Sequence, residues 1–246
     1  MPRFRISLAY EGTDFVGWQR QPAGTSVQGL LEDALRELDA RDVTVIGAGR
    51  TDAGVHALEQ VAAFTLEREI APDTLVRALN VRLPGTVRVV TAAVPRADFH
   101  PQFDAVSKTY RYRLWNDAVL PPFERRYAWH VMGPLDVNAM QHAAAVLLGS
   151  HDFAAFQAAD SDAKTTEREI VQSDIRRLQP ALLEYEITGN GFLRHMVRTI
   201  VGSLVNIGRG RCSPEWLHEV LRSRDRRQAG RTAPPHGLFL VRVNYK

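Results

Sequence analysis

The sequence predicts an α+β fold built from two related halves that face one another across a cleft. Short segments in which apolar and polar residues alternate are typical of half-buried strands. Longer segments with apolar residues three and four positions apart are typical of helices. The two kinds of segment follow each other in a similar order in residues 1–104 and 105–246, without a visible sequence repeat. We therefore expect an N-terminal and a C-terminal half, joined through a shared sheet or standing as two separate domains.

The N-terminal half is expected to contain four strands and two helices. Alternation at residues 4–10 predicts the first strand. Thr25 and Gln28 have the spacing of a capping box, and apolar residues then recur at helical spacing as far as Leu38. The remaining strands are expected at 43–46, 60–66 and 87–94, and the second helix at 73–81. Pro84 and Gly85 stop that helix.

The C-terminal half is expected to repeat this mixture. Its strands are predicted at 108–115, 126–131, 169–178, 182–188 and 238–245. Asp136 is the expected N-cap of a helix that ends at Gly149. The longest amphipathic helix is expected over 191–207, ended by Gly208, and a shorter helix follows at 214–221.

Composition excludes several classes of protein. The chain has 246 residues, of which 45% are apolar and 24% charged, which argues against extended disorder and collagen-like repeats. Cys212 is the only cysteine, so neither an intramolecular disulfide nor a Cys-x-x-Cys zinc or redox motif can form. We expect a reducing, cytoplasmic compartment, because the first residues show no signal-peptide pattern. No apolar run reaches the roughly 18 residues that a membrane span needs, so no membrane partner is expected.

The positive charge is concentrated towards the C-terminus. The net charge is only +3, yet 28 of the 31 basic residues are arginine. Residues 191–231 carry nine arginines against three acidic residues, a net charge of +6, whereas residues 131–190 carry −5. Arginine suits phosphate groups, so this segment favours a nucleic-acid partner. A GC-rich genome and a solvated helix face are the alternative explanations.

The densest local motif is GAGRTDAGVHA at 47–57. Three glycines with Thr51 and Asp52 predict a sharply turning loop that exposes its central side chains. An ionised Asp52 could act as a nucleophile, a general base or a metal ligand. An aspartate in such a turn can equally serve only to cap the turn through its own side chain. The glycine spacing does not match a dinucleotide-binding loop.

The chain resembles the tRNA pseudouridine synthase A family. Besides GRTDAGVHA at 49–57, family-like blocks occur in the expected order along nearly the whole chain. These blocks are YEGTDFVGWQRQP (10–22), TSVQGLLEDAL (25–35), FHPQFDA (99–105), KTYRY (108–112), GSHDFAAF (149–156), GNGFLRHMVRTIVGSL (189–204) and APPHGLFL (233–240). The resemblance implies two ferredoxin-like or RRM-like halves that share a mainly antiparallel sheet, with the active-site cleft between them.

The resemblance also implies the reaction. It is the isomerisation of uridine to pseudouridine at positions 38, 39 and 40 in the anticodon stem-loop of tRNA, in a cytoplasmic homodimer. The reaction has no redox step, so no cofactor and no metal are expected. Asp52 corresponds to the catalytic nucleophile. Whether this carboxylate adds to C1′, adds to C6 or starts the loss of the C2′ proton stays open.

Four further residues are assigned to substrate binding by resemblance. Tyr110 corresponds to the tyrosine that packs against the target uracil, and Arg50 to the arginine that holds the flipped nucleotide. Arg198 corresponds to the partner of the catalytic carboxylate, and Leu238 is expected to pack beneath the base. Taken as isolated residues, Tyr110 could face the core and either arginine could be a surface charge.

Two residues of these blocks are interpreted differently. His195 is treated as a structural or RNA-facing residue. Gln102 stands where relatives commonly have a basic residue, so a phosphate contact there is expected to be weaker.

Two other functions are weighed against the enzyme. A non-catalytic RNA-binding protein could use the same fold. A metallohydrolase built on Asp14 and Asp52 is disfavoured, because no cluster of histidine and aspartate ligands accompanies them.

Overall fold

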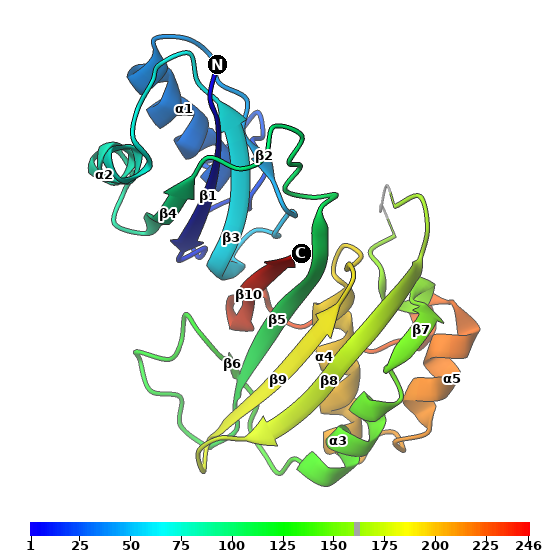
Figure 1. Ribbon diagram of the computed structural model, residues 1–246. Coiled ribbons are helices and arrows are strands. Elements are labelled where there is room, and N and C mark those ends of the chain that lie inside the picture. Colours follow the sequence, from blue (N-terminus) through cyan, green and yellow to red (C-terminus); the bar gives the residue numbers. More distant parts are fainter. Residues whose placement is uncertain (160–162) are drawn as a thin grey trace. The chain divides into compact units, whose positions relative to one another are not determined.

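The computed structural model describes residues 1–159 and 163–246. The chain forms two compact units, shown in Figure 1. The first unit comprises Met1–Val106 together with Phe239–Lys246, and the second comprises Ser107–Leu238. The described residues contain ten strands and five α-helices, and most strand pairs are antiparallel. The predicted α+β class is therefore confirmed.

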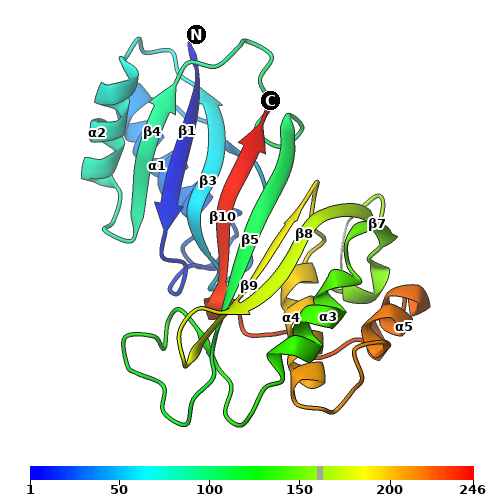
Figure 2. The same ribbon diagram turned by 60° about the horizontal axis from the view of Figure 1, so that its bottom comes forward.

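The sheet of the first unit has the strand order β4-β1-β3-β10, with β2 also paired to β3. Its strands are β1 (Arg3–Tyr10), β2 (Ile46–Gly47), β3 (His56–Thr65), β4 (Val87–Ala93) and β10 (Leu238–Tyr245). β1 lies antiparallel to both β3 and β4, whereas β10 runs parallel to β3. Figures 1 and 2 show α1 (Val27–Asp39) and α2 (Pro72–Arg82) on the same face of this sheet.

Alternation in β1 and helical spacing in α1 produce the core of the first unit. Phe4, Ile6 and Leu8 of β1 are buried, as are Leu31 and Leu35 of α1. Each such side chain contributes about 1.5–3 kcal/mol when it leaves water. The apolar face of the helix and the apolar face of the strand are thus buried together.

Three predicted boundaries in this unit were wrong. The N-cap of α1 is Ser26, not Thr25, because the Ser26 hydroxyl accepts a hydrogen bond from the backbone N–H of Gly29 at 3.1 Å. The strand expected at 43–46 shrinks to β2, because the backbone of Val45 instead bonds side chains of α1. β3 starts four residues earlier than expected, since its first residues pair with β10.

The sheet of the second unit has the order β5-β9-β8-β7, with β6 paired parallel to β5. Its strands are β5 (Ala105–Trp115), β6 (Trp129–His130), β7 (Gly149–Asp152), β8 (Glu167–Arg177) and β9 (Leu182–Gly189). Its helices are α3 (Val137–Ala145), α4 (Met196–Gly208) and α5 (Trp216–Ser223). Three short 3₁₀ helices are η1 (Ala154–Phe156), η2 (Arg226–Gln228) and, before β10, η3 (Pro235–Gly237).

The helices of the second unit lie on one side of its sheet. Figures 1 and 2 show α3 and α4 against the same face, with α5 beside β7. In both units strands alternate with helices in the order β1-α1-β3-α2-β4 and β5-α3-β8-β9-α4. This order is consistent with two ferredoxin-like halves.

Two helix boundaries and one strand in the second unit differ from prediction. α3 ends at Ala145, and Gly149 opens β7 rather than closing the helix. α4 begins only at Met196, because His195 has a left-handed backbone with φ of 64° that cannot continue into a right-handed helix. The strand expected at 126–131 is reduced to β6, since turns occupy the preceding residues. No helix in the described part of the chain is long and apolar enough to cross a membrane.

The backbone of α4 packs closely against residues 230–233. A Cβ on Gly202 would lie 1.7 Å from the carbonyl oxygen of Arg231. The Ser203 hydroxyl accepts a hydrogen bond from the backbone N–H of Gly230 at 2.9 Å. Gly202 is therefore required because no side chain fits between the two segments.

We expect Gly202→Ala to lower the free energy of unfolding by about 1–3 kcal/mol, because the added methyl group forces the two backbones apart. Gly85→Ala is the matched control, since its Cβ would meet only one arginine nitrogen at 3.8 Å. Urea unfolding followed by circular dichroism measures both. Equal midpoints for the two variants would contradict the close-packing argument.

Candidate active site

Asp52 lies in the loop of residues 48–55, here called the Asp52 loop, which joins β2 to β3. The side chain of Gln60 in β3 donates a hydrogen bond to the carbonyl oxygen of Gly49 at 2.9 Å. The hydroxyl of Thr51 lies 2.8 Å from the phenol oxygen of Tyr10 at the end of β1. Two neighbouring strands therefore fix the loop just before its aspartate.

Tyr10 and Gln60 are buried. Burial raises the pKa of Tyr10 to about 12, although hydrogen bonds with Thr51 and Gln60 act in the opposite direction. The phenol therefore keeps its proton near neutral pH and can donate it to the Thr51 hydroxyl. Hydrogen bonds shielded from water in this way hold a loop more firmly than exposed ones do.

Residues 11–26, here called the 11–26 loop, pack directly on the Asp52 loop. The backbone N–H of Trp18 donates to the carbonyl oxygen of Thr51 at 3.0 Å, and that of Gly54 donates to Phe15 at 3.3 Å. Gly17 has a φ of 108°, and a Cβ there would lie 2.7 Å from the Thr51 carbonyl oxygen. A glycine is needed at this position for both its conformation and its closeness to Thr51.

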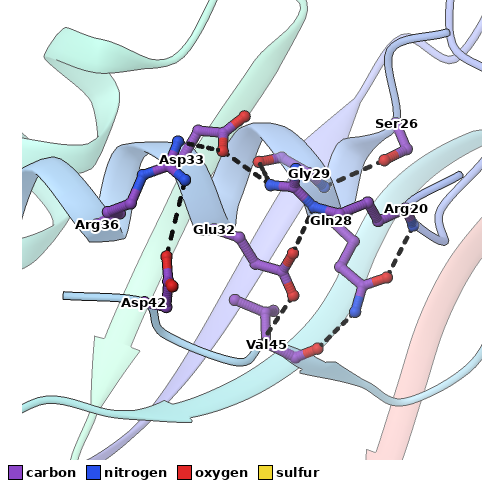
Figure 3. A network of polar contacts seen from close by, with 9 residues as sticks. All are labelled: Arg20, Ser26, Gln28, Gly29, Glu32, Asp33, Arg36, Asp42 and Val45. Atoms are coloured by element: carbon purple, nitrogen blue, oxygen red, sulfur yellow. Dashed lines mark hydrogen bonds and ion pairs between the residues drawn. The ribbon is translucent and has the colours of Figure 1, made fainter. Parts of the chain in front are cut away.

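A polar network on α1, drawn in Figure 3, anchors both neighbours of the Asp52 loop. The Arg20 guanidinium contacts Glu32 at 2.7 Å and Asp33 at 2.8 Å, and these carboxylates raise its pKa, Asp33 most strongly. Gln28 accepts a hydrogen bond from the backbone N–H of Arg20 and donates one to the carbonyl oxygen of Val45, both at 2.9 Å. Exposed ion pairs contribute little free energy, so the network matters chiefly for position.

His56 closes the other end of the Asp52 loop. Its Nδ1 accepts a hydrogen bond from the backbone N–H of Gly12 at 2.9 Å and lies 3.6 Å from the Glu11 carboxylate. The buried imidazole stacks on Phe239 of β10, with ring centroids 4.7 Å apart. The first residue of β3 thus contacts both the 11–26 loop and the last strand.

The two predicted site residues of the first unit differ in exposure. Asp52 is half-buried, and its backbone carbonyl accepts a hydrogen bond from the N–H of Val55 at 3.2 Å, which turns the chain back towards β3. Arg50 is exposed. A carboxylate is therefore presented on a fixed loop with an arginine two residues away.

Tyr110 of β5 is 8% exposed and lies opposite Ile187 of β9. Its ring meets Phe192 edge-on, with centroids 4.9 Å apart and an interplanar angle of 76°. Phe192 lies in the segment between β9 and α4. The aromatic strand and the start of the basic segment are therefore in contact.

Arg198 and the segment that leads to Leu238 are joined in the second unit. The Nε of Arg198 donates to the carbonyl oxygen of Ala233 at 2.8 Å, and the backbone N–H of Ala233 donates back to Arg198 at 3.0 Å. The buried Tyr112 donates its hydroxyl to the carbonyl oxygen of Pro234 at 2.7 Å. Arg198 therefore positions backbone as well as carrying charge, and Leu238 is buried at the end of this segment.

Two kinds of residue escaped sequence reasoning. Tyr10 and Gln60 were overlooked, because a strand tyrosine and a strand glutamine carry no signal that they meet a distant loop. Thr51 was identified only as part of the turning motif, without its contact to Tyr10. His236 of η3 was also overlooked, although it lies inside the APPHGLFL block. Burial lowers the pKa of His236, a backbone hydrogen bond with Ala128 raises it, and the nearby charge of Arg198 lowers it further. A neutral imidazole is favoured beside this arginine.

The arginines of segment 191–231 differ in their partners. Arg224 pairs with Asp152 at 3.0 Å and Arg227 with Asp225 at 2.8 Å, which neutralises part of the charge. Arg209 and Arg211 have no carboxylate partner among the described residues. Burial lowers the pKa of Arg209, and the positive charges of Arg211 and Arg231 lower it further. This cluster of like charges is suited to an anionic ligand.

Metal binding has no support in the described ranges, 1–159 and 163–246. No three or more histidine, cysteine, aspartate or glutamate side chains there are grouped so that they could hold a metal ion. The described residues therefore do not support the hypothesis of a metallohydrolase built on Asp14 and Asp52.

Comparison with known proteins identifies the family. A family model described as tRNA pseudouridine synthase matches residues 6–104 and 143–246. The chain is 47% identical over 246 residues to tRNA pseudouridine synthase A of Myxococcus xanthus, covering 100% of this chain and 93% of the relative. It is 46% identical over 248 residues to the protein of that name from Solibacter usitatus, with both chains covered completely. The chain belongs to the tRNA pseudouridine synthase family, enzymes that isomerise uridine to pseudouridine in tRNA.

Proposed function

We propose that this enzyme acts on uridines 38, 39 and 40 of the anticodon stem-loop, with Asp52 as the catalytic nucleophile. The observation that carries the proposal is the Asp52 loop. It presents a half-buried carboxylate on backbone held by Thr51, Tyr10 and Gln60. Catalytic groups need this fixed geometry, because a displacement of about 1 Å can cost a factor of roughly 10² in rate.

The isomerisation needs no external group donor. The bond between C1′ and N1 of uridine breaks and a bond between C1′ and C5 forms. The proton on C5 is released and N1 takes up a proton, so the product is an isomer of the substrate. Electrons balance without an oxidant or reductant. A carboxylate can hold the sugar or the base covalently while the uracil turns.

The other predicted residues are proposed to bind the extruded nucleotide. A base in a stem must leave the helix, at a cost of a few kcal/mol. Stacking on Tyr110 would return about 1–3 kcal/mol of this cost. Arg50 and Arg198 are proposed to hold the phosphates and the Asp52 carboxylate respectively, and Leu238 to pack beneath the uracil.

Three wider proposals accompany this assignment. Residues 1–104 carry the nucleophile, and residues 105–246 carry the basic helix and the aromatic strand. The working form is a homodimer, in which two-fold symmetry doubles the positive surface offered to one tRNA. The enzyme works in the cytoplasm, where its tRNA substrate is found.

Asp52→Asn is expected to abolish turnover while sparing tRNA affinity. The amide keeps the shape of the carboxylate but is a poor nucleophile, so the rate falls by at least about 10³-fold. The measurement is tritium release from tRNA labelled with [5-³H]uridine, together with filter binding of the same tRNA. Asp42→Asn, at an exposed carboxylate, is the matched control. Product formation by Asp52→Asn would refute the nucleophile, and wild-type protein that binds tRNA without releasing tritium would refute the enzyme.

Thr51→Val is expected to lower kcat roughly 10- to 100-fold with little change in KM, because it frees the Asp52 loop from Tyr10 without touching the tRNA surface. Thr51→Ser restores the hydroxyl and should recover most of the rate. Single-turnover kinetics separate chemistry from binding. Equal kcat for the valine and serine variants would show that the buried hydrogen bond does not position the loop.

The double change Arg209→Ala and Arg211→Ala is expected to weaken tRNA binding and to flatten its salt dependence. Each lost phosphate contact reduces the slope of log K against log[salt] by about 0.7–0.9. Arg227→Ala is the control, since that arginine already pairs with Asp225. An unchanged slope in the double variant would show that Arg209 and Arg211 do not meet phosphate.

A further inference from the structure

An exposed aromatic side chain in the first unit is held in a fixed orientation. Phe103 is 77% exposed, and its ring stacks on the imidazole of His100 with centroids 4.2 Å apart and an interplanar angle of 24°. Single exposed apolar residues are common and need no explanation. A fixed one is different, because its outer face is offered to solvent in one orientation.

His100 is immobilised by four hydrogen bonds within residues 96–104, here called the 96–104 loop. Its backbone N–H donates to the Asp104 carboxylate at 2.9 Å, and its carbonyl oxygen accepts from the Asp104 N–H at 3.0 Å. Its Nδ1 accepts from the backbone N–H groups of Gln102 and Phe103, both at 3.2 Å. The imidazole therefore fixes the backbone that carries the Phe103 ring as well as the ring itself.

The 96–104 loop is also attached to the rest of its unit. Arg96 pairs with Asp104 at 2.6 Å, and the backbone N–H of His100 together with this guanidinium holds the pKa of Asp104 below its ordinary value. The hydroxyl of Tyr245 in β10 donates to the carbonyl oxygen of Pro101 at 2.6 Å. The buried Phe99 packs on Tyr245, with ring centroids 5.2 Å apart.

We propose that Phe103, backed by His100, is a stacking platform for a nucleobase of the bound tRNA, separate from the catalytic residues. Aromatic faces stack on bases of any sequence, each stack being worth a measurable gain in affinity. A platform that is already rigid loses little conformational freedom on binding. Arg96 contacts Asp98 at 3.2 Å as well as Asp104, so its charge is balanced within the loop and the aromatic face carries the proposed contact.

The occupant follows from the chemistry of the patch and from the family. The substrate of this family is tRNA, which presents flat aromatic bases next to negative charge. The 96–104 loop offers a flat aromatic face that a neighbouring ring holds in one orientation. Phe123 provides a contrast, since it is 89% exposed but has no ring partner among the described residues. Both phenylalanines are exposed, but of the two it is the Phe103 ring that a neighbouring ring holds in a fixed orientation.

The test compares tRNA dissociation constants for Phe103→Ala, Phe103→Leu and Phe103→Tyr, with Phe123→Ala as the matched control. Loss of one stacked base weakens binding roughly 5- to 150-fold, which we expect for the alanine variant. The leucine variant keeps apolar area without an aromatic face, so it should also bind weakly. The tyrosine variant and Phe123→Ala should bind like wild type. The salt slope should stay unchanged in all four, because no charge is altered.

Several results would overturn the platform. Wild-type affinity in Phe103→Ala or Phe103→Leu would show that no base stacks there. Equal losses in Phe103→Ala and Phe123→Ala would indicate a general effect of exposed apolar surface. A change of oligomeric state in sedimentation velocity would assign Phe103 to a contact between copies of this chain. Turnover of the alanine variant at saturating tRNA should match wild type, which separates this proposal from the assignment of Asp52.

Discussion

The buried contact between Tyr10 and Thr51 is the constraint on which the arrangement of the first unit depends. A loop rich in glycine has many accessible conformations and cannot hold a carboxylate in place by itself. Tyr10, Thr51 and Gln60 supply hydrogen bonds away from water, and the 11–26 loop fits closely because Gly17 lacks a side chain. The polar network on α1 then holds the 11–26 loop and the segment before β2. Helix, strands and loops therefore all contribute to the position of the Asp52 loop.

In the second unit, a segment is held in place by close backbone packing rather than by a buried network of side-chain hydrogen bonds. Residues 230–233 approach α4 as closely as Gly202 allows, and Arg198 and Tyr112 bond the carbonyl oxygens that follow. Part of the guanidinium of Arg198 is used to hold this segment. A residue assigned to charge by its family therefore also has a packing role, and the two cannot be separated by removing the side chain.

Residues of the same type on the surface have different partners, and the amino-acid composition does not reveal this difference. A net charge of +3 conceals arginines already paired, such as Arg227, and arginines that have no carboxylate partner in the described part of the chain, such as Arg209. The same holds for phenylalanine, since Phe103 is fixed by a neighbouring ring and Phe123 is not. Surface residues of one type therefore differ in their surroundings, which the composition does not record.

The sequence by itself determined the α+β class, the family, and the strands at 169–178, 182–188 and 238–245. Alternation, helical spacing and contiguous motifs are local properties of the chain, so they can be recognised without the fold. Only the tertiary structure decided that Ser26 caps α1, that α4 starts after the left-handed His195, and that β3 begins at its pairing with β10. It also decided which residues support the Asp52 loop. Tyr10 and Thr51 are 41 positions apart, and no local pattern records a contact made only when two strands fold together.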